Sequence, residues 1–335
     1  MSYKKVILNQ FGGPEVLNVA EEIKLPEPAQ TEVRVKVLAA STTFTDTMIR
    51  NGTYYGFKEK PPLSPGYDMV GIVDATGSGV TEFSIGDMVA DLTIWGAYTE
   101  YMIRPAEALV AVPRGLDPAE AVSMVLSYVT AYQMLHRSCM LNAGNRILVH
   151  GAGGAVGTAL LELGNLMDLE LYGTASKSKH ELVTRLGATP IDYNSEDFVE
   201  VMKGIGGVDA VFDAISGENF KRSFRSLRKG GSLIAYGFYD AAMGKGGSVP
   251  LDFLSVVFMN LLPNGRKASF YGIGQLREKH PDWFKEDLAA LFQLLEAGKI
   301  KPTIERRIKL EDAQEAHTLI ESAVVKGRIV MELNR

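Results

Sequence analysis

A glycine-rich segment, Gly151-Ala-Gly-Gly-Ala-Val-Gly157, contains the residues that could receive a phosphate group. The apolar run at 147–149 before it is typical of a buried parallel strand, and residues 158–167 after it predict a helix. A strand, a glycine turn and a helix in this order can bind a dinucleotide, because glycines let a pyrophosphate approach backbone N–H groups at the helix start. The strict G-x-G-x-x-G spacing is not met, since Val156 stands at the third glycine position. A plain strand-to-helix turn therefore stays open as an alternative.

The strand predicted at 169–174 lacks the acidic residue that usually binds the ribose 2′-hydroxyl of NAD at this point. Ser176, Lys177 and Lys179 follow it instead. A hydroxyl and two ammonium groups suit a 2′-phosphate, which a carboxylate would repel. These residues favour NADPH as the cofactor, with a solvated basic loop as the alternative.

Strands and helices alternate through the middle of the chain. Further strands are predicted at 189–192, 210–213, 232–236 and 268–271, and helices at 179–186, 196–202, 220–227 and 251–262. This alternation predicts a doubly wound parallel sheet of the Rossmann type. An apolar helical stretch at 118–135 precedes it, and we expect a break in this stretch near Ser127.

Both ends of the chain have a different pattern. Residues 1 to about 120 are β-rich, and in the strand predicted at 31–38 valines alternate with charged residues. A helix at 283–297, strands at 303–310 and 327–333, and a helix at 311–324 between these strands are predicted to pack back onto the N-terminal part. We therefore predict one domain from residues 1–122 with 273–335 and a second, NADPH-binding domain at 123–272.

Bulk properties limit the function classes. The chain has 335 residues, of which 46% are hydrophobic and 22% charged, and its formal net charge is −5. These values are ordinary for a soluble globular protein and give no reason to expect nucleic acid or an anionic membrane as a partner. No apolar run is long enough to predict membrane insertion, and Cys139 is the only cysteine, so a zinc site built from several thiolates is excluded. We expect a cytoplasmic protein.

Several ordered strings carry a resemblance to a known family. They are Phe11-Gly-Gly-Pro-Glu-Val-Leu17, Ser64-Pro-Gly-Tyr-Asp-Met-Val-Gly71, Phe83-Ser-Ile-Gly-Asp-Met-Val89, Val149-His-Gly-Ala-Gly-Gly-Ala-Val-Gly157, Gly173-Thr-Ala-Ser-Lys-Ser-Lys-His-Glu181 and Leu227-Arg-Lys-Gly-Gly-Ser-Leu233. On these strings the chain resembles the zinc-independent branch of the medium-chain dehydrogenase/reductase superfamily. It is similar to the zeta-crystallin-like quinone oxidoreductases and, more closely, to vesicle amine transport protein-like members.

The resemblance implies a β-rich GroES-like catalytic domain beside the Rossmann domain, and a set of residues at the cofactor. It places Gly154, Ala155 and Val156 at the pyrophosphate, Thr174, Ser176 and Lys179 at the adenosine ribose and its phosphate, Tyr193 beside the adenosine, Thr130 on the nicotinamide side, and Tyr236, Gly237, Phe270 and Tyr271 at the strand ends that face the cofactor. For Tyr193 and Phe270, packing in the core or the cleft wall is an equal alternative.

The zinc enzymes of the family offer a contrast. Their catalytic metal needs an early cysteine and a histidine after the Pro-Gly turn, where this chain has Thr43 and Tyr67. The resemblance places Tyr54 at the active-site tyrosine position, as a polar contact or acid, although it could equally wall an aromatic pocket. Phe44 and Trp95 complete the expected lining with Tyr54 and Tyr67. Thr43 stands where the family usually has asparagine, and we expect it at the substrate.

Without a metal, hydride transfer from NADPH to a quinone or an α,β-unsaturated carbonyl compound is the reaction we expect. One alternative is an NADPH-binding interaction protein with little turnover, and another is a zinc alcohol dehydrogenase. A homodimer is also predicted, because residues 268–272 have the pattern of an edge strand and the family often joins its sheets edge to edge.

Overall fold

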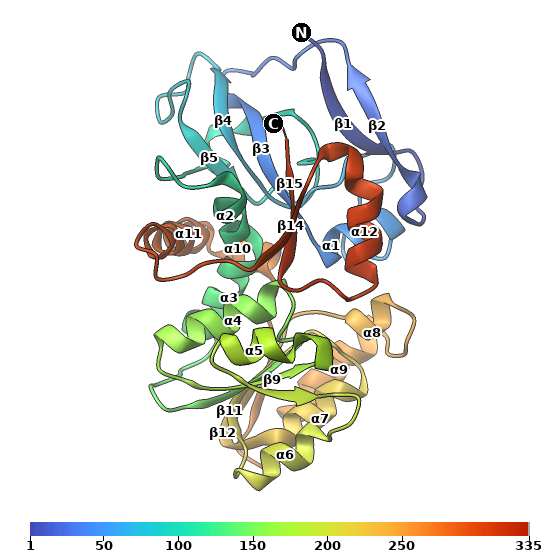
Figure 1. Ribbon diagram of the computed structural model, residues 1–335, viewed down its shortest axis with the longest axis vertical. Coiled ribbons are helices and arrows are strands. Elements are labelled where there is room, and N and C mark those ends of the chain that lie inside the picture. The colour runs from blue at the N-terminus through green and yellow to red at the C-terminus, as the bar shows by residue number, and fades with distance from the viewer. Residues whose placement is uncertain (334–335) are drawn as a thin grey trace. The chain divides into compact units, whose positions relative to one another are not determined.

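A computed structural model describes residues 1–333 of the chain (Figure 1). The chain divides into two compact units, one formed by Met1–Val129 with the segment from Pro281 onward, the other by Thr130–His280. The two boundaries between these units lie seven and eight positions later in the chain than the domain limits predicted at residues 122 and 272. Those predicted limits stay a prediction.

Six strands form the sheet of the second unit, and every neighbouring pair is parallel. Their order is β10-β9-β8-β11-β12-β13. Their bounds are Arg146–His150 (β8), Glu170–Ala175 (β9), Thr189–Asp192 (β10), Val208–Asp213 (β11), Leu227–Ala235 (β12) and Lys267–Phe270 (β13). The predicted doubly wound sheet is confirmed, and β13 has the predicted edge position.

Helices lie between and after the strands of this unit along the chain, and several of them pack on the sheet through an apolar side. Their bounds are Ala155–Leu166 (α4), His180–Arg185 (α5), Phe198–Gly204 (α6), Glu218–Ser226 (α7), Tyr239–Ala242 (α8), Val249–Met259 (α9) and Ile273–Lys279 (α10). Helix α4 packs on β8 and β9, α7 packs on β11 and β12, and α9 packs on β13 (Figure 1). Leu148, Tyr172, Val211 and Phe220 belong to one buried cluster, so their side chains meet on the α7 face of the sheet.

The helical stretch before the sheet continues where a break was expected. It consists of α2 (Pro118–Ser123), a π-helical turn η3 (Met124–Tyr128), α3 (Val129–Gln133) and a second π-helical turn η4 (Met134–Ser138). The expected break near Ser127 is therefore wrong. The backbone widens there and remains helical.

The first unit is built on a seven-stranded sheet with the order β14-β15-β3-β4-β5-β7, in which β6 also pairs with β3. The bounds are Glu32–Thr42 (β3), Met69–Thr76 (β4), Met88–Asp91 (β5), Tyr101–Pro105 (β6), Val110–Ala111 (β7), Ile304–Ile308 (β14) and Arg328–Glu332 (β15), and a separate hairpin is formed by Tyr3–Leu8 (β1) and Leu17–Glu22 (β2). Val33, Val35 and Val37 of β3 are fully buried, as their alternation predicts. Strand β15 pairs with β3, which confirms that the C-terminal segment packs onto the N-terminal part.

Helices α1 (Phe44–Asn51), α11 (Pro281–Glu296) and α12 (Ala313–Glu321) complete the first unit, and α12 packs on α1. The remaining short helical turns are Pro14–Val16 (η1), Ala106–Ala108 (η2), Lys177–Lys179 (η5, in the second unit) and Leu310–Asp312 (η6). Within residues 1–333, no helix combines the length and the apolar character needed to span a bilayer.

Candidate functional site

The carboxyl ends of the parallel strands form the edge of the second unit at which a ligand is expected. After β8 the chain adds β9 and then β10 on one side, and β11 pairs with β8 on the other side. The strand order therefore reverses between β8 and β11. In open parallel sheets, ligands bind outside the carboxyl ends of the strands at such a reversal. The glycine turn follows β8 directly, so it lies at this position.

The glycine turn leaves the start of α4 open to an anion. Gly151 has a positive φ of 65°, which favours glycine, and a Cβ added at Gly157 would lie 2.7 Å from the Cα of Ala152. Helix α4 begins at Ala155, three residues earlier than predicted, with Gly154 as its N-cap. Among the described residues no side chain caps this helix start, and its first turn contains no acidic residue. The predicted pyrophosphate residues Gly154, Ala155 and Val156 therefore lie at the positive end of the helix dipole.

Lys179 lies against the glycine turn. A Cβ added at Gly153 would be 2.7 Å from the Cδ and 3.0 Å from the Cβ of Lys179, so the lysine stem occupies the space that glycine leaves. Ser176 directly follows β9 and is the N-cap of η5, and its Oγ lies 3.2 Å from the Oγ of Ser178. The structure thus brings Lys179 and the pyrophosphate turn together. It supplies a hydroxyl and an ammonium group where a 2′-phosphate is expected.

Two other residues predicted at the adenosine have opposite surroundings. Tyr193 follows β10 and is 57% exposed, so its ring is available to a ligand. Thr174 is only 3% exposed, and its Oγ1 lies 2.9 Å from the Nδ1 of His150. The hydroxyl of Thr174 is therefore already hydrogen-bonded to a buried neighbour.

The other predicted cofactor residues lie mostly in packed surroundings. Phe270 stacks with Phe238 at a ring-centroid distance of 5.4 Å and contacts Phe253 at 4.2 Å, which agrees with the packing alternative. The hydroxyl of Tyr271 donates to Gln133 Oε1 at 2.7 Å. Three further predicted residues are Thr130, which is buried in α3, and Tyr236 and Gly237, which directly follow β12. Burial raises the pKa of Tyr236 above its usual value.

A buried polar network that the sequence analysis missed lies just below this edge. It links His150 and Thr174 with Ser223 and Asp213, at the ends of β8, β9 and β11 and on α7. The available signal was a polar residue at the end of each of two apolar strands, Ile147-Leu-Val-His150 and Val211-Phe-Asp213. Only the sheet order shows that these two ends are neighbours.

In the first unit, Thr43 and Asp46 close the start of α1. The Thr43 hydroxyl donates to Asp46 Oδ2 at 2.7 Å, the Thr43 N–H donates to the same oxygen at 2.9 Å, and the Asp46 N–H donates to Thr43 Oγ1 at 3.3 Å. This is a capping box. Gly66 N–H donates to the other carboxylate oxygen at 3.0 Å, which ties the helix to the Pro-Gly turn. Burial raises the pKa of Asp46 to about 7.

Tyr54 and Tyr67 form a pair. Their hydroxyls are 2.7 Å apart, and their rings meet edge to face at 6.0 Å between centroids. Burial raises the pKa of Tyr54, so its phenol keeps the proton at neutral pH. Trp95 is 40% exposed, and its loop is tied to the same turn, because the N–H of Ile94 donates to the carbonyl of Tyr67 at 3.1 Å.

The donor set of this unit does not suggest a metal site. Within residues 1–333, no three histidine, cysteine, aspartate or glutamate residues are grouped so that they could hold a metal ion. Burial lowers the pKa of His317 to about 3, and its ring lies 3.3 Å from both Arg50 NH1 and the hydroxyl of Tyr98. In the second unit, burial raises the pKa of Cys139 to about 12. Reaction without a metal stays a prediction.

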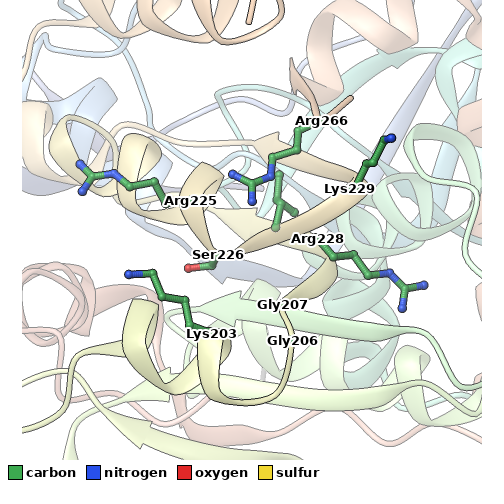
Figure 2. Close-up of a pocket in the computed structure, with 9 residues that line it drawn as sticks. Lys203, Gly206, Gly207, Arg225, Ser226, Arg228, Lys229 and Arg266 are labelled. Atoms are coloured by element: carbon green, nitrogen blue, oxygen red, sulfur yellow. The ribbon is translucent and has the colours of Figure 1, made fainter. Parts of the chain in front are cut away.

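The second unit also has a pocket, which is formed by residues outside the predicted cofactor set. It has a volume of about 330 Å³ and is lined by Lys203, Gly206, Gly207, Arg225, Ser226, Leu227, Arg228, Lys229 and Arg266 (Figure 2). Three of its cations are paired, namely Lys203 with Glu200, Arg225 with Glu218, and Arg228 with Asp209. Figure 2 shows the charged ends of Arg225 and Arg228 pointing away from each other. An anion would therefore not meet converging donors here.

Parts of the chain match models of known protein families, and the whole chain is similar to known proteins. The model of the alcohol dehydrogenase GroES-like domain matches residues 29–114, and the model described as zinc-binding dehydrogenase matches residues 186–331. Quinone oxidoreductase of Rattus norvegicus is 30% identical over 333 residues, covering 97% of this chain and 96% of the relative. The human synaptic vesicle membrane protein VAT-1 homolog-like is 30% identical, with 99% and 81% covered.

A solved structure extends the likeness to three dimensions. Escherichia coli quinone oxidoreductase, solved in complex with NADPH, has a TM-score of 0.88 and 26% identity, covering 98% of this chain and 99% of that one. Together these matches span both units. The chain therefore belongs to the medium-chain dehydrogenase/reductase family of oxidoreductases, in the group that contains the quinone oxidoreductases and the VAT-1 homologues.

Proposed function

We propose that the protein is a reductase that uses NADPH to transfer hydride to a quinone or an α,β-unsaturated carbonyl compound without a metal ion. The observation that carries the proposal is the contact between Lys179 and the glycine turn at the strand-order reversal. A cation beside the pyrophosphate turn, with no carboxylate ending β9, suits a dinucleotide that bears an additional phosphate. The quinone oxidoreductase solved with NADPH supports the same cofactor.

The residues present fit this cofactor. Close packing of the turn requires glycine at Gly153 and Gly157, and the start of α4 offers N–H groups at the positive end of its dipole. Ser176 and Lys179 would hold the 2′-phosphate, and Tyr193 would cover the adenine. The nicotinamide, when bound, supplies the hydride.

The Tyr54–Tyr67 pair is proposed to act on the acceptor. As hydride reaches the β-carbon of an enone, negative charge develops on the carbonyl oxygen, and a positioned hydroxyl stabilises that charge. The phenol of Tyr54 has this capacity because it remains protonated at neutral pH, and its proton is available to the acceptor when Tyr67 is the donor in the hydrogen bond between the two hydroxyls. Thr43 is proposed to line the same site, held by Asp46.

A panel of quinones and enones tests this function, with NADPH oxidation followed by absorbance and NADPH binding measured by titration. We expect turnover with at least one member and a saturable complex with NADPH. Binding without turnover across the panel would favour the interaction protein with little turnover. Activity that requires a stoichiometric transition metal, detected by elemental analysis, would contradict the proposal.

We also propose a homodimer that forms through the second unit. Strand β13 is an edge of the parallel sheet, and α9 packs beside it. The outer residues of α9 and the turn after it are large, apolar and exposed: Leu251, Leu254, Val257, Phe258, Leu261 and Leu262. A second copy of the chain would pair its own β13 edge with this edge and cover the apolar face of α9 with its own.

A further inference from the structure

Four buried polar side chains lie in a line beneath the carboxyl edge of the parallel sheet. The Oγ1 of Thr174 is 2.9 Å from the Nδ1 of His150, and the Nε2 of His150 is 2.9 Å from the Oγ of Ser223. The Oγ of Ser223 is 2.6 Å from the Oδ2 of Asp213. All four are buried, and the His150 ring is held edge-on against Phe198 at 4.6 Å between centroids.

The direction of the hydrogen bonds is set at the Asp213 end. Its Oδ1 accepts from the N–H of Ile215 at 2.7 Å, and its Oδ2 accepts from the amide of Asn219 at 2.9 Å. Ser223 also donates to Oδ2. A hydroxyl has a single proton, so the Ser223 oxygen can only accept from His150.

This determines the tautomer of His150. Burial lowers the pKa of His150, so its ring is neutral and carries one proton. Because Ser223 accepts, that proton lies on Nε2, and Nδ1 is left as an acceptor. The hydroxyl of Thr174 must then donate to Nδ1.

We propose that Thr174, His150, Ser223 and Asp213 form one directional hydrogen-bond relay, which positions the strand ends at the cofactor site, and that Thr174 is a positioning residue rather than a phosphate ligand. The inference rests on the proposed NADPH site and assigns a role within it. Thr174 donates its only proton inward, so it has none to give to a phosphate oxygen.

The relay joins the two turns that would receive phosphate. Gly151 follows His150 directly, and Ser176 lies two residues after Thr174. The N–H of Ala152 in the glycine turn donates to the carbonyl of Thr174 at 3.0 Å, which links the same two turns through the backbone. The relay therefore fixes the pyrophosphate turn relative to the turn of Ser176 and Lys179. Preorganised turns of this kind benefit the whole dinucleotide, with or without the 2′-phosphate.

The first test is the tautomer of His150, measured by nitrogen-15 NMR on the full chain without cofactor. We expect Nε2 to carry the proton and Nδ1 to have the shift of an unprotonated acceptor. The Ser223→Ala variant should remove this preference. A proton on Nδ1 in the unmodified chain would overturn the relay, because Thr174 would then accept and its hydroxyl would be released.

The second test compares binding of NADPH and NADH to Thr174→Val and Ser223→Ala. We expect each variant to weaken both cofactors by the same factor, roughly fivefold, as for one net hydrogen bond. The double variant should lose little more than either single one, because both break one relay. Loss confined to NADPH in Thr174→Val would instead make Thr174 a phosphate ligand.

Ser226→Ala is the matched control, since Ser226 lies on the same helix, is equally buried, and donates to Arg222 in its own helix at 3.1 Å. It should leave both affinities unchanged. If Ser223→Ala does not fold, Thr174→Val and the tautomer of the unmodified chain decide the question. A chain that shows the expected tautomer but binds neither cofactor would overturn the proposed function and leave the relay intact.

Discussion

Lys177 and Lys179 lie in the same short turn and carry the same charge, but they differ in what their stems contact. Lys179 lies over Gly153, where the pyrophosphate turn leaves room, whereas Lys177 is exposed to solvent. A charge contributes to binding only where its position is held near the ligand. Lys179 is therefore the lysine that we propose as a phosphate ligand, and Lys177 is the one that we expect to stay in solvent.

Lys179→Ala should weaken NADPH binding by about 1–2 kcal/mol, the loss of a charge-assisted contact, and should leave NADH almost unchanged. Titration of both cofactors against the variant measures this difference. Lys177→Ala is the control and should have little effect on either cofactor. An equal loss for both cofactors in Lys179→Ala would remove Lys179 from the phosphate site.

Tyr54 and Tyr55 offer a similar contrast in the first unit. Tyr54→Phe removes the hydroxyl that bonds Tyr67 and should lower kcat by about 10²-fold or more if that hydroxyl assists the acceptor oxygen. Tyr55 is 63% exposed, so Tyr55→Phe should leave kcat unchanged. Steady-state kinetics on the best acceptor of the panel compares them. Unchanged kcat in Tyr54→Phe would assign Tyr54 to the wall of an aromatic pocket.

At the scale of elements, two helix starts are arranged in opposite ways. Helix α1 begins with a capping box, in which Thr43 and Asp46 occupy each other's polar groups. Helix α4 begins with glycine and, within the described residues, has no side-chain cap. A capped start is stable by itself, whereas an uncapped start is ready to bind an anion.

The capping carboxyl of α1 makes stability depend on pH. Burial raises the pKa of Asp46 from 3.8 to about 7, so the folded chain holds this proton more tightly than the unfolded chain. Its contribution to stability is full below about pH 4 and is lost as the pH rises through about 7. Asp68 acts in the same direction, with its pKa raised by burial to about 6.

In the unmodified chain, the Asp46 contribution to the free energy of unfolding falls between about pH 4 and pH 7. We expect Asp46→Asn to remove this fall, which is on the order of 1–3 kcal/mol. Denaturant unfolding at a series of pH values measures the difference between the variant and the unmodified chain. That difference is the relevant quantity, because carboxyls with lowered pKa values, such as Glu170 and Asp197, oppose the trend in both chains. Parallel curves would show that Asp46 has an ordinary pKa.

At the scale of the whole molecule, the apolar face of α9 is the feature that a solvated monomer does not explain. A row of large apolar side chains beside a sheet edge is costly in water and attracts a partner. The chain's net charge of −5 is modest, so charge repulsion between copies is weak.

A charge on that face should separate the copies. Leu261→Glu would bury a carboxylate in the proposed interface, and sedimentation should show a shift from dimer toward monomer. Leu166→Glu is the control, because Leu166 is an exposed leucine on α4 of the same unit. A chain that sediments as a monomer without substitution would refute the homodimer.

The parallel strands were predictable because each is a short apolar run, such as Ile147-Leu148-Val149, bounded by turn residues. The start of helix α1 could be located only from the structure, where the hydrogen bonds between Thr43 and Asp46 define its cap. Spacing predicted Lys179, since it depends on residues close in sequence. His150 and Asp213 are 63 positions apart and become neighbours only through the pairing of β8 with β11. Their roles therefore required the fold.

The packing of the Lys179 stem on Gly153 has a consequence for how the cofactor preference of this chain could change. A single methyl group there would meet the Cδ of Lys179 at 2.7 Å, so the outer part of the lysine side chain would have to turn away. It would also meet the Cβ of Lys179 at 3.0 Å, a contact that only a small backbone shift relieves. The charge would remain in the chain but would leave the place where the extra phosphate is recognised. Nucleotide choice could thus drift in evolution, or be redesigned, through a substitution that adds only bulk and alters no charged residue.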